Sequence, residues 1–359
     1  MKGILIMNNY DENPNVYCSC IDLESFQLNV STHIGYISNC LSTCCLMSMY
    51  NNAAELTDDP KESLNNFIEF RRNMIEENKR VYQTDNKERV HTNLCVNCSK
   101  YVVKEWETNT SEMSFVSLAV GPSPCQSKCI YCGHIQYDNI MTDKSIEGYE
   151  KLFKLMKYSK DIGIINDKSI IQIASGEITI HPYKDKMIEM VDGFTTLFLS
   201  NCFKFDQGIA DHLKSNPHSR INLSIDSGTA ITWKKVKGFN NFNTVLNNLR
   251  KYYNYCDQVN HQQIELKYII LPGINTRMQD YLGVINIMKE LNVKKLIISK
   301  DLRTLSDTSS SEYQEVIDNI IKLAILCVQH GLTYELHNLI FSDEQLKYVN
   351  DSINKNERV

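Results

Sequence analysis

From residue 115 onward, short apolar runs of strand-forming residues alternate with amphipathic stretches of helical spacing. Six runs predict strands: FVSLAV, SIIQIAS, TTLFLSN, INLSIDS, IELKYIIL and KKLIIS. The stretches between them, such as YEKLFKLMKYSK, FNTVLNNLRKYYNY and QDYLGVINIMKELN, predict helices. Continuous apolar strands that alternate with helices indicate a parallel sheet covered on its faces, either a barrel or an open doubly wound sheet. In both folds the chemistry gathers at the carboxyl ends of the strands.

Length and composition limit the class of protein. The 359 residues are enough for one large domain and a smaller one, and a hydrophobic fraction of 42% supports a packed core. A formal charge of −5 provides no basic field for nucleic acid or anionic lipid. Because no apolar run is long enough for a membrane span and the N-terminus lacks a secretory pattern, we expect a cytoplasmic protein without membrane or nucleic-acid partners.

The cysteines are concentrated in the first part of the chain. Seven of the 13 fall in the first hundred residues, namely Cys18, Cys20, Cys40, Cys44, Cys45, Cys95 and Cys98. In the reducing cytosol so many cysteines are better explained by metal ligation than by disulfides. We therefore expect a small, cysteine-rich, metal-binding domain over residues 1–110, joined to a larger α/β domain. Its helix-like segment SLNNFIEFRRNMIEENK carries Arg71 and Arg72, which we expect on a solvated face.

Three further cysteines follow the first predicted strand of the larger domain. Cys125, Cys129 and Cys132 lie in the segment GPSPCQSKCIYCGH and have the spacing CxxxCxxC. Three thiolates at this spacing can hold three irons of a [4Fe-4S] cluster and leave the fourth iron without a protein ligand. The alternative is a zinc site, but structural zinc normally takes four protein ligands.

With the aromatic Tyr131 before the last cysteine, this motif resembles that of the radical S-adenosylmethionine superfamily. The resemblance covers roughly residues 113–300 and implies a partial (β/α)6 TIM-like barrel, which we assign to residues 111–340, with a C-terminal tail over 341–359. It further implies that S-adenosylmethionine binds the open iron and is cleaved by one electron to a 5'-deoxyadenosyl radical. That radical would abstract hydrogen from a C–H bond of the substrate.

Later strand ends carry residues similar to the cofactor-binding positions of this superfamily. Ser175, Gly176 and Glu177 resemble its GGE element, which receives the methionyl ammonium group, although a serine replaces the first glycine. Glu177 could instead be a surface acid. Ser200 ends the third strand, and we expect it to contact the cofactor as well.

The fourth strand places Ser224 and Asp226 on one face, because side chains alternate along a strand. Similar positions in the superfamily contact ribose hydroxyls and the cofactor carboxylate. For Asp226 the alternative is an ordinary Asp-Ser-Gly turn. Lys267, Asp301 and Arg303 lie near later strand ends, where they either face substrate or are solvated charges.

The N-terminal cysteines predict a second cluster. Cys20 and Cys40 bracket Gly35, and Cys95 and Cys98 form a CxxC pair, so that four thiolates are available for a [4Fe-4S] cluster. The spacing resembles the auxiliary-cluster modules called SPASM and twitch domains, which normally follow the barrel, whereas this one precedes it. The same thiolates could bind zinc, and three other cysteines could replace individual ligands, namely Cys18, Cys44 and Cys45.

The reaction that follows hydrogen abstraction is left open by the sequence. Cys202 follows the third strand and is a candidate hydrogen-atom donor for an epimerisation, or else a small packed residue. The superfamily resemblance implies an oxidoreductase or epimerase acting on a peptide, with flavodoxin or ferredoxin as electron donor. The alternatives are an enzyme acting on a carbohydrate or aminoglycoside and a non-catalytic iron-sulfur sensor.

Overall fold

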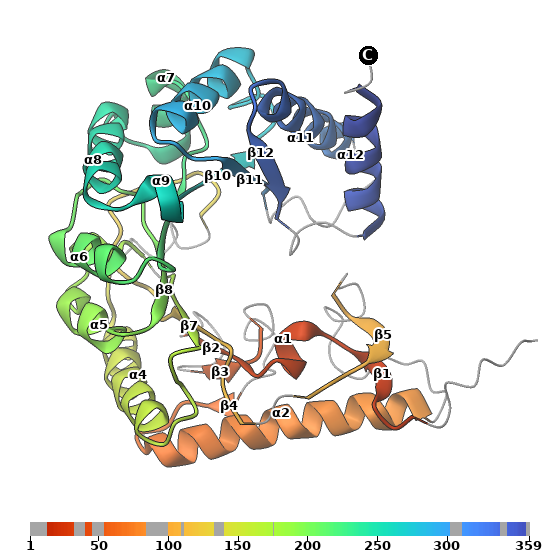
Figure 1. Cartoon of the computed structure of the whole chain (residues 1–359). Coiled ribbons are helices and arrows are strands. Elements are labelled where there is room, and N and C mark those ends of the chain that lie inside the picture. The colour runs from red at the N-terminus through yellow and green to blue at the C-terminus, as the bar shows by residue number, and fades with distance from the viewer. Residues whose placement is uncertain are drawn as a thin grey trace, which may run out of the picture. The chain divides into compact units, whose positions relative to one another are not determined.

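The computed structural model describes residues 13–31, 40–44, 54–83, 100–108, 111–132, 140–174, 176–301, 311–337 and 343–356. The chain divides into two compact units (Figure 1). The first unit comprises Met1–Val116 and Glu147–Ser169, and the second comprises Ser117–Ile146 and Ile170–Val359. The functional domain boundaries drawn from the sequence stay predictions.

A parallel sheet forms the centre of the second unit. Its strands follow one another in chain order: β6 (Phe115–Ala119), β7 (Ile170–Ile173), β8 (Thr195–Leu199), β9 (Arg220–Ser224), β10 (Ile264–Ile270), β11 (Lys295–Lys300) and β12 (Thr333–Leu336). Every pair of neighbours from β7 to β12 is parallel. The structure thus confirms the six strands predicted from apolar runs and adds β12, giving a mixed α/β fold.

Helices follow the strands of this sheet in sequence (Figure 1). They are η3 (Ile178–Ile180), α5 (Lys184–Met190), α6 (Gln207–Ser215), α7 (Ala230–Lys237), α8 (Phe242–Tyr255), α9 (Gln258–His261), α10 (Met278–Glu290), α11 (Ser311–Gln329) and α12 (Asp343–Asn356). Thr229 caps α7 by accepting from the backbone of Thr232, and Gly238 ends that helix in the left-handed conformation. The segment predicted as a tail contains α12, which contacts α11.

The first unit combines short antiparallel strands with long helices. Strand β1 (Val16–Ser19) pairs with β5 (Val102–Glu105), while β3 (Cys40–Ser42) pairs with both β2 (Gln27–Ser31) and β4 (Ala54–Glu55). The helices are α1 (Ile21–Glu24), α2 (Pro60–Gln83) and most of α4 (Asp143–Asp161).

The expectation that Arg71 is solvated is wrong. Its side chain is only 4% exposed, and its guanidinium donates to the backbone oxygens of Leu23 at 2.6 Å and Glu24 at 2.9 Å. These carbonyls belong to the short helix α1, so Arg71 ties α2 to α1, whereas its neighbour Arg72 is exposed as predicted. Across the described ranges, no helix has the length and apolar character needed to span a membrane.

Candidate metal and cofactor site

The three-cysteine loop begins directly after β6 and is fixed to the rest of the second unit through its backbone. The amides of Lys128 and Ile130 donate to the carbonyls of Lys237 and Val236, each at 3.0 Å. These carbonyls lie in the last turn of α7, where a helix has no internal donors for them. The loop therefore completes the end of α7 while α7 holds the loop.

Two glycines permit this close approach. A Cβ on Gly176 would lie 2.6 Å from the backbone oxygen of Pro124, and one on Gly238 would lie 2.9 Å from the Cβ of Lys128. Both glycines also have positive φ, a conformation that other residues rarely adopt. Next to Gly176, the backbone amide of Glu177 donates to Pro124 at 2.7 Å. The predicted GGE-like element thus packs against the cysteine loop.

All three loop thiols are partly exposed and have the chemistry of iron ligands. The pKa of Cys125 is raised to about 12, chiefly by burial and also by the Glu177 carboxylate and the neighbouring Cys129 and Cys132 thiols. A metal would reverse this effect, because coordination deprotonates a thiol. Within the described ranges, no three His, Cys, Asp or Glu side chains form a group that could hold a metal ion, so the ligand roles stay predictions.

Hydrogen-bond donors already face two of these sulfurs. The side-chain amide of Asn201 donates to Cys125 Sγ at 3.7 Å, and the Ser127 hydroxyl lies 3.2 Å from Cys129 Sγ. Donors at the sulfurs are among the groups that set the potential of an iron-sulfur cluster. The contact of Asn201 could not be predicted from sequence, because Asn201 lies 76 positions from Cys125.

Glu177 is buried and its carboxylate is fully engaged by the protein. Oε1 accepts from the Thr179 hydroxyl at 2.7 Å and the Ser200 hydroxyl at 2.8 Å, and Oε2 accepts from the backbone amide of Asn201 at 2.6 Å. Burial raises its pKa, and these donors oppose the shift. The alternative of a surface acid is therefore wrong, and Glu177 joins the ends of β7 and β8. Its predicted contact with the cofactor stays a prediction.

Asp226 is also buried, but it has a counter-charge. Its Oδ2 accepts from Lys237 Nζ at 2.5 Å and from the Tyr131 hydroxyl at 2.6 Å, and its Oδ1 accepts from the backbone amide of Ile269 at 2.7 Å. Burial raises the pKa of Tyr131 well above its usual value, and the Asp226 carboxylate adds to this shift. Tyr131 belongs to the cysteine motif, so this cluster connects the loop to β9, β10 and α7.

The same cluster shows what sequence reasoning missed. Lys237 is 2% exposed and also donates to the Tyr131 hydroxyl at 2.6 Å. We predicted that Tyr131 and Asp226 contact the cofactor, whereas here their polar atoms contact each other and Lys237. In the sequence, the only indication of this contact is the position of Lys237 directly before Gly238, which ends α7.

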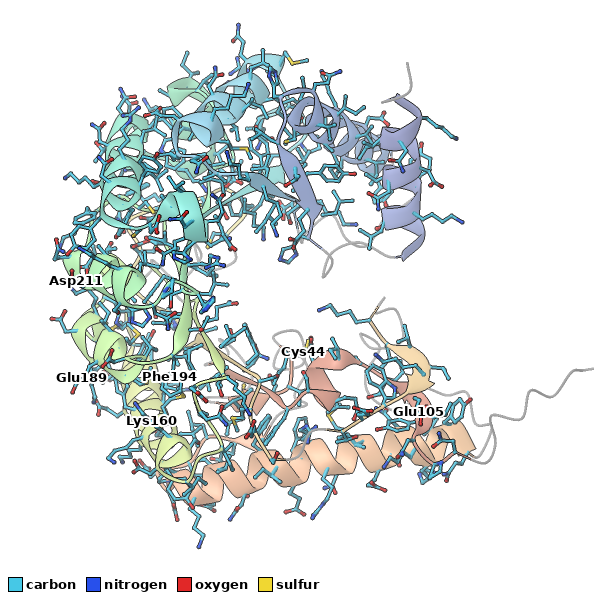
Figure 2. All side chains as sticks on the ribbon, viewed as in Figure 1. Cys44, Glu105, Lys160, Glu189, Phe194 and Asp211 are labelled. Atoms are coloured by element: carbon cyan, nitrogen blue, oxygen red, sulfur yellow. The ribbon has the colours of Figure 1, made fainter. Side chains whose placement is uncertain are left out.

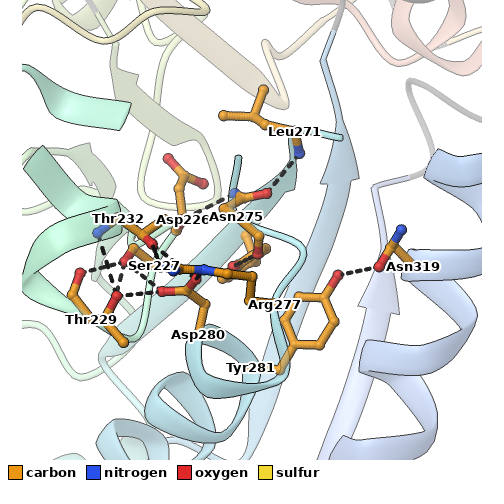
Figure 3. Close-up of polar contacts among 11 residues, drawn as sticks. Asp226, Ser227, Thr229, Thr232, Leu271, Asn275, Arg277, Asp280, Tyr281 and Asn319 are labelled. Atoms are coloured by element: carbon orange, nitrogen blue, oxygen red, sulfur yellow. Dashed lines mark hydrogen bonds and ion pairs between the residues drawn. The ribbon is translucent and has the colours of Figure 1, made fainter. Parts of the chain in front are cut away.

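A second buried hydrogen-bond network joins α10 to the residues that follow β9 (Figure 3). Asp280 of α10 accepts from the hydroxyls of Thr229 at 2.7 Å and Thr232 at 2.9 Å. A Cβ on Gly283 would lie only 2.3 Å from the backbone oxygen of Gly228, so α10 packs directly against the turn after β9. This network gives Asp226 a rigid backbone support.

Asn275 fixes the same region from the β10 side (Figure 3). Its side-chain amide donates to the backbone oxygens of Asp226 at 2.9 Å and Ile269 at 2.8 Å, and its oxygen accepts from the backbone of Leu271 at 2.8 Å. The ends of β9 and β10 are thereby held together.

The remaining predicted residues of the second unit differ in accessibility. Ser224 is partly exposed at the end of β9, and Ser200 is buried against Glu177. Cys202 is 0% exposed and burial raises its pKa, which favours the alternative of a packed thiol; its donor role stays a prediction. Asp301 is buried. Two predictions, Ser175 and Arg303, fall outside the described residues.

The N-terminal cysteines are only partly covered by the described residues. Cys20 and Cys44 both pack against a core cluster of the first unit that includes Tyr17 and Trp106. Cys44 is labelled in Figure 2. Cys40 is buried in β3, and Cys18 lies in β1. Cys45, Cys95 and Cys98 lie outside the described residues. The predicted ligand set of Cys20, Cys40, Cys95 and Cys98 stays a prediction.

No family model matches the chain, but part of it is similar to curated proteins. GTP 3',8-cyclase of Clostridium acetobutylicum is 23% identical over 180 residues, which cover 47% of this chain and 51% of the relative. Its namesake from Petrotoga mobilis is 23% identical over 175 residues, covering 47% and 51%. The chain thus spans about half the length of the curated relatives it matches.

Solved structures give partial likenesses. Streptococcus suis SuiB bound to S-adenosylmethionine has a TM-score of 0.47 and 11% identity, over 77% of this chain and 59% of SuiB. Coproporphyrinogen III oxidase (HemN) from Escherichia coli, described as a radical SAM enzyme, has a TM-score of 0.40 and 12% identity, over 60% and 52%. The sequence similarity to the cyclases, together with the CxxxCxxC motif, supports the radical S-adenosylmethionine superfamily as the class of this protein.

Proposed function

We propose that this chain is a radical S-adenosylmethionine enzyme, an oxidoreductase or epimerase. The observation that carries the proposal is the placement of Cys125, Cys129 and Cys132 on one loop at the carboxyl end of β6, next to the ends of β7, β9 and α7. Catalytic groups of parallel α/β folds occupy this edge. We also propose that this sheet and its helices form a partial (β/α)6 TIM-like barrel.

In this proposal the three cysteines ligate a [4Fe-4S] cluster that supplies, with S-adenosylmethionine, the radical that abstracts hydrogen. The chain's own residues hold the geometry. Gly176 lets the GGE-like turn approach the loop, and the pair Asp226–Lys237 fixes Tyr131 within the motif. Ser224 offers an accessible hydroxyl to the cofactor. Flavodoxin or ferredoxin is the proposed electron donor.

We propose a peptide as the substrate, because the cysteine-rich first unit resembles the auxiliary modules of peptide-modifying members. Cys20, one of the proposed ligands, and Cys44, an alternative ligand, pack against the same core cluster, which supports a shared thiol site. A second candidate substrate is a nucleoside triphosphate, since the curated relatives are called GTP 3',8-cyclase.

Anaerobic reconstitution tests the proposal. With dithionite and S-adenosylmethionine, the full chain should release 5'-deoxyadenosine, and Cys125→Ala, Cys129→Ala and Cys132→Ala should each abolish the release. Cys327→Ala removes a buried thiol of α11 and serves as the matched control, with activity retained. A wild-type protein with intact iron-sulfur absorbance that releases no 5'-deoxyadenosine would rule out the enzymatic function.

The iron content distinguishes a second [4Fe-4S] cluster in the first unit from a zinc site. About eight irons per chain would support two [4Fe-4S] clusters, whereas about four irons with one zinc would make the N-terminal site structural. A panel of peptides and GTP, followed by mass spectrometry, distinguishes the two substrate classes.

A further inference from the structure

Strand β5 forms an open edge of the small antiparallel sheet β1–β5 in the first unit (Figure 1). Among the residues that the structure describes, this sheet has two strands, so β5 is paired on one side only. Strand β1 packs against α2, whereas β5 is exposed along its whole length, with Val102 at 37% and Val103 at 53%. An open edge with exposed apolar side chains is a template on which another strand can pair.

The hydrogen-bond pattern of the pair β1–β5 identifies the backbone groups at the open edge. The amide of Trp106 donates to the carbonyl of Asn15 at 2.9 Å, directly beyond the last register pair. In an antiparallel pair, residues that turn their backbone groups toward the partner alternate with residues that turn them away. The backbone groups of Val103 and Glu105 therefore point away from β1, and neither amide donates to a residue that the structure describes.

A groove of about 430 Å³ adjoins the end of β5. Ile21 and Glu24 of α1 contribute to its lining, as do residues 104–107. The Trp106 side chain is buried, and its Nε1 donates to the backbone oxygen of Tyr17 at 3.0 Å, so this part of the lining is held in place. Ile21, by contrast, is 47% exposed. An extended chain that continues along β5 would bury this apolar surface.

The exposed charges along this edge favour a cationic partner. Glu105 and Glu107 are both exposed, and neither forms an ion pair with a described residue. The carboxylate of Glu105 accepts from the neutral side-chain amide of Asn13 at 2.8 Å. Glu24 also lines the groove, but its two carboxylate oxygens accept from hydroxyl groups, each at 2.6 Å. The carboxylates open to a partner are therefore those of Glu105 and Glu107.

The lysine of β5 does not protect this edge. Native proteins often place a lysine on an exposed edge strand, where it opposes the addition of another strand. Alternation puts the side chain of Lys104 on the face opposite Val103 and Glu105. Its ammonium lies 4.0 Å from the centre of the Trp106 ring, in a cation–π contact. The two exposed carboxylates thus outnumber the one ammonium, which is already engaged.

We propose that the open edge of β5 binds an extended, cationic peptide segment as an added strand. The backbone groups of Val103 and Glu105 supply the hydrogen bonds, and alternate side chains of the segment supply specificity. The segment that fits carries positive charges opposite Glu105 and Glu107 and an apolar side chain opposite Val103, because directly opposed side chains interact across strands. This surface belongs to the first unit, and the proposal does not rest on the proposed function.

A capped peptide in which lysine, lysine and valine alternate with threonine is the probe. Its fluorescently labelled form is titrated with the full chain, and anisotropy gives the dissociation constant. Methylation of the peptide nitrogens that donate to β5 should weaken binding about tenfold or more, because strand addition then loses its hydrogen bonds. Equal binding of the methylated peptide overturns strand addition without any change to the protein.

Val103→Pro tests the same hydrogen bonds from the side of the protein. Proline removes the outward amide of residue 103 but none of the amides that donate to β1, and edge strands tolerate proline. We expect about tenfold weaker binding, whereas Val103→Thr keeps the amide and should change the affinity about twofold at most. A folded Val103→Pro protein that binds the peptide like the wild type contradicts the proposal.

Glu107→Lys tests the charge of the partner. At low ionic strength it should weaken binding about fivefold, because two like charges then face each other across the strands. Glu69→Lys changes an exposed carboxylate of α2 and should bind the peptide like the wild type. The same affinity for both variants shows that the edge does not select a cationic segment.

Amide hydrogen exchange locates the bound peptide. A saturating concentration should slow the exchange of Val103 and Glu105, because their amides become hydrogen-bonded. Unchanged exchange of both amides places the peptide elsewhere and overturns the proposal. Self-association of the full chain that Val103→Pro abolishes would show that a second copy occupies this edge, which also overturns it.

Discussion

Two buried carboxylates lie at strand ends beside the cysteine loop, and their surroundings differ. At the ends of β7 and β8, Glu177 accepts from hydroxyls and backbone amides, all of which are neutral. At the ends of β9 and β10, Asp226 accepts from a tyrosine, a backbone amide and the ammonium of Lys237. The hydrogen bonds of Glu177 are satisfied but its charge is not balanced, whereas both are provided for Asp226.

The difference has consequences for stability. Neutral donors leave the negative charge of Glu177 enclosed, and its pKa is accordingly raised by burial. At Asp226 the cation removes that penalty but creates a dependence on a single partner. The Glu177 region should therefore respond to pH, and the Asp226 region should respond to loss of its lysine.

The largest effect is expected from Lys237→Met. It leaves the buried carboxylate of Asp226 without its cation, which costs about 3–5 kcal/mol of unfolding free energy. Urea unfolding checks this value. Lys157→Met, which breaks the exposed Lys157–Asp161 pair of 2.7 Å, is the matched control and should change little. The double variant Asp226→Asn with Lys237→Met should recover part of the loss, and no recovery would contradict the pairing.

Gly283→Ala tests the support behind Asp226. The new Cβ would meet the Gly228 backbone, which cannot move aside like a flexible side chain, so we expect about 1–3 kcal/mol of destabilisation. Gly208→Ala is the control within another helix, where the nearest atom is the end of the Ile188 side chain at 3.0 Å. Equal stability of the two variants in urea would show that the Gly228–Gly283 contact is not tight.

Glu177→Gln tests the neutral-donor region and its pH dependence. Losing acceptors for several donors should cost about 1–2 kcal/mol. An acid whose folded pKa is raised favours folding below its ordinary value of 4.5, and this contribution is lost as the pH rises to the folded pKa. The deficit of the variant should therefore shrink with rising pH in urea titrations. A deficit that grows with pH would reverse the assigned direction.

The smallest effect on stability is expected from Asn201→Ala. It removes the side-chain donor to Cys125 Sγ and should cost about 1 kcal/mol or less. In the reconstituted protein, loss of a donor to sulfur should make the midpoint potential of the cluster more negative. Asn222→Ala removes the β9 side chain that donates to Glu265. This variant should leave the potential unchanged. Equal midpoint potentials in the wild type and both variants would show that Asn201 does not affect the cluster.

The sequence predicts well what depends on local pattern. Six strands follow from their apolar runs, whereas β12 escapes prediction because TYEL has only one buried residue. Helix α7 is short, and its amphipathic pattern covers only two turns. Arg71 looks like a surface residue in sequence, because its backbone acceptors lie 47 and 48 positions away.

The residues of the candidate site also divide into those that a local pattern predicts and those that it does not. The cysteine loop and strand-end residues can be found from motif order, since each lies next to a predicted strand. Their partners cannot, because Lys237 meets Tyr131 across 106 positions and only the folded chain brings them together. Burial could not be predicted either: Glu177 and Asp226 are both buried and hydrogen-bonded within the protein, and their predicted contacts with the cofactor stay predictions.

The backbone link between the cysteine loop and α7 makes the two segments a single cooperative element. The amides of Lys128 and Ile130 donate to carbonyls in the last turn of α7, so these hydrogen bonds depend on that turn being formed. In deuterated buffer these two amides should exchange together with those of that turn, in one kinetic class. Fraying of this helix terminus would thus release the cysteine segment, so the lifetime of that terminus would limit how long the three proposed ligands keep their positions.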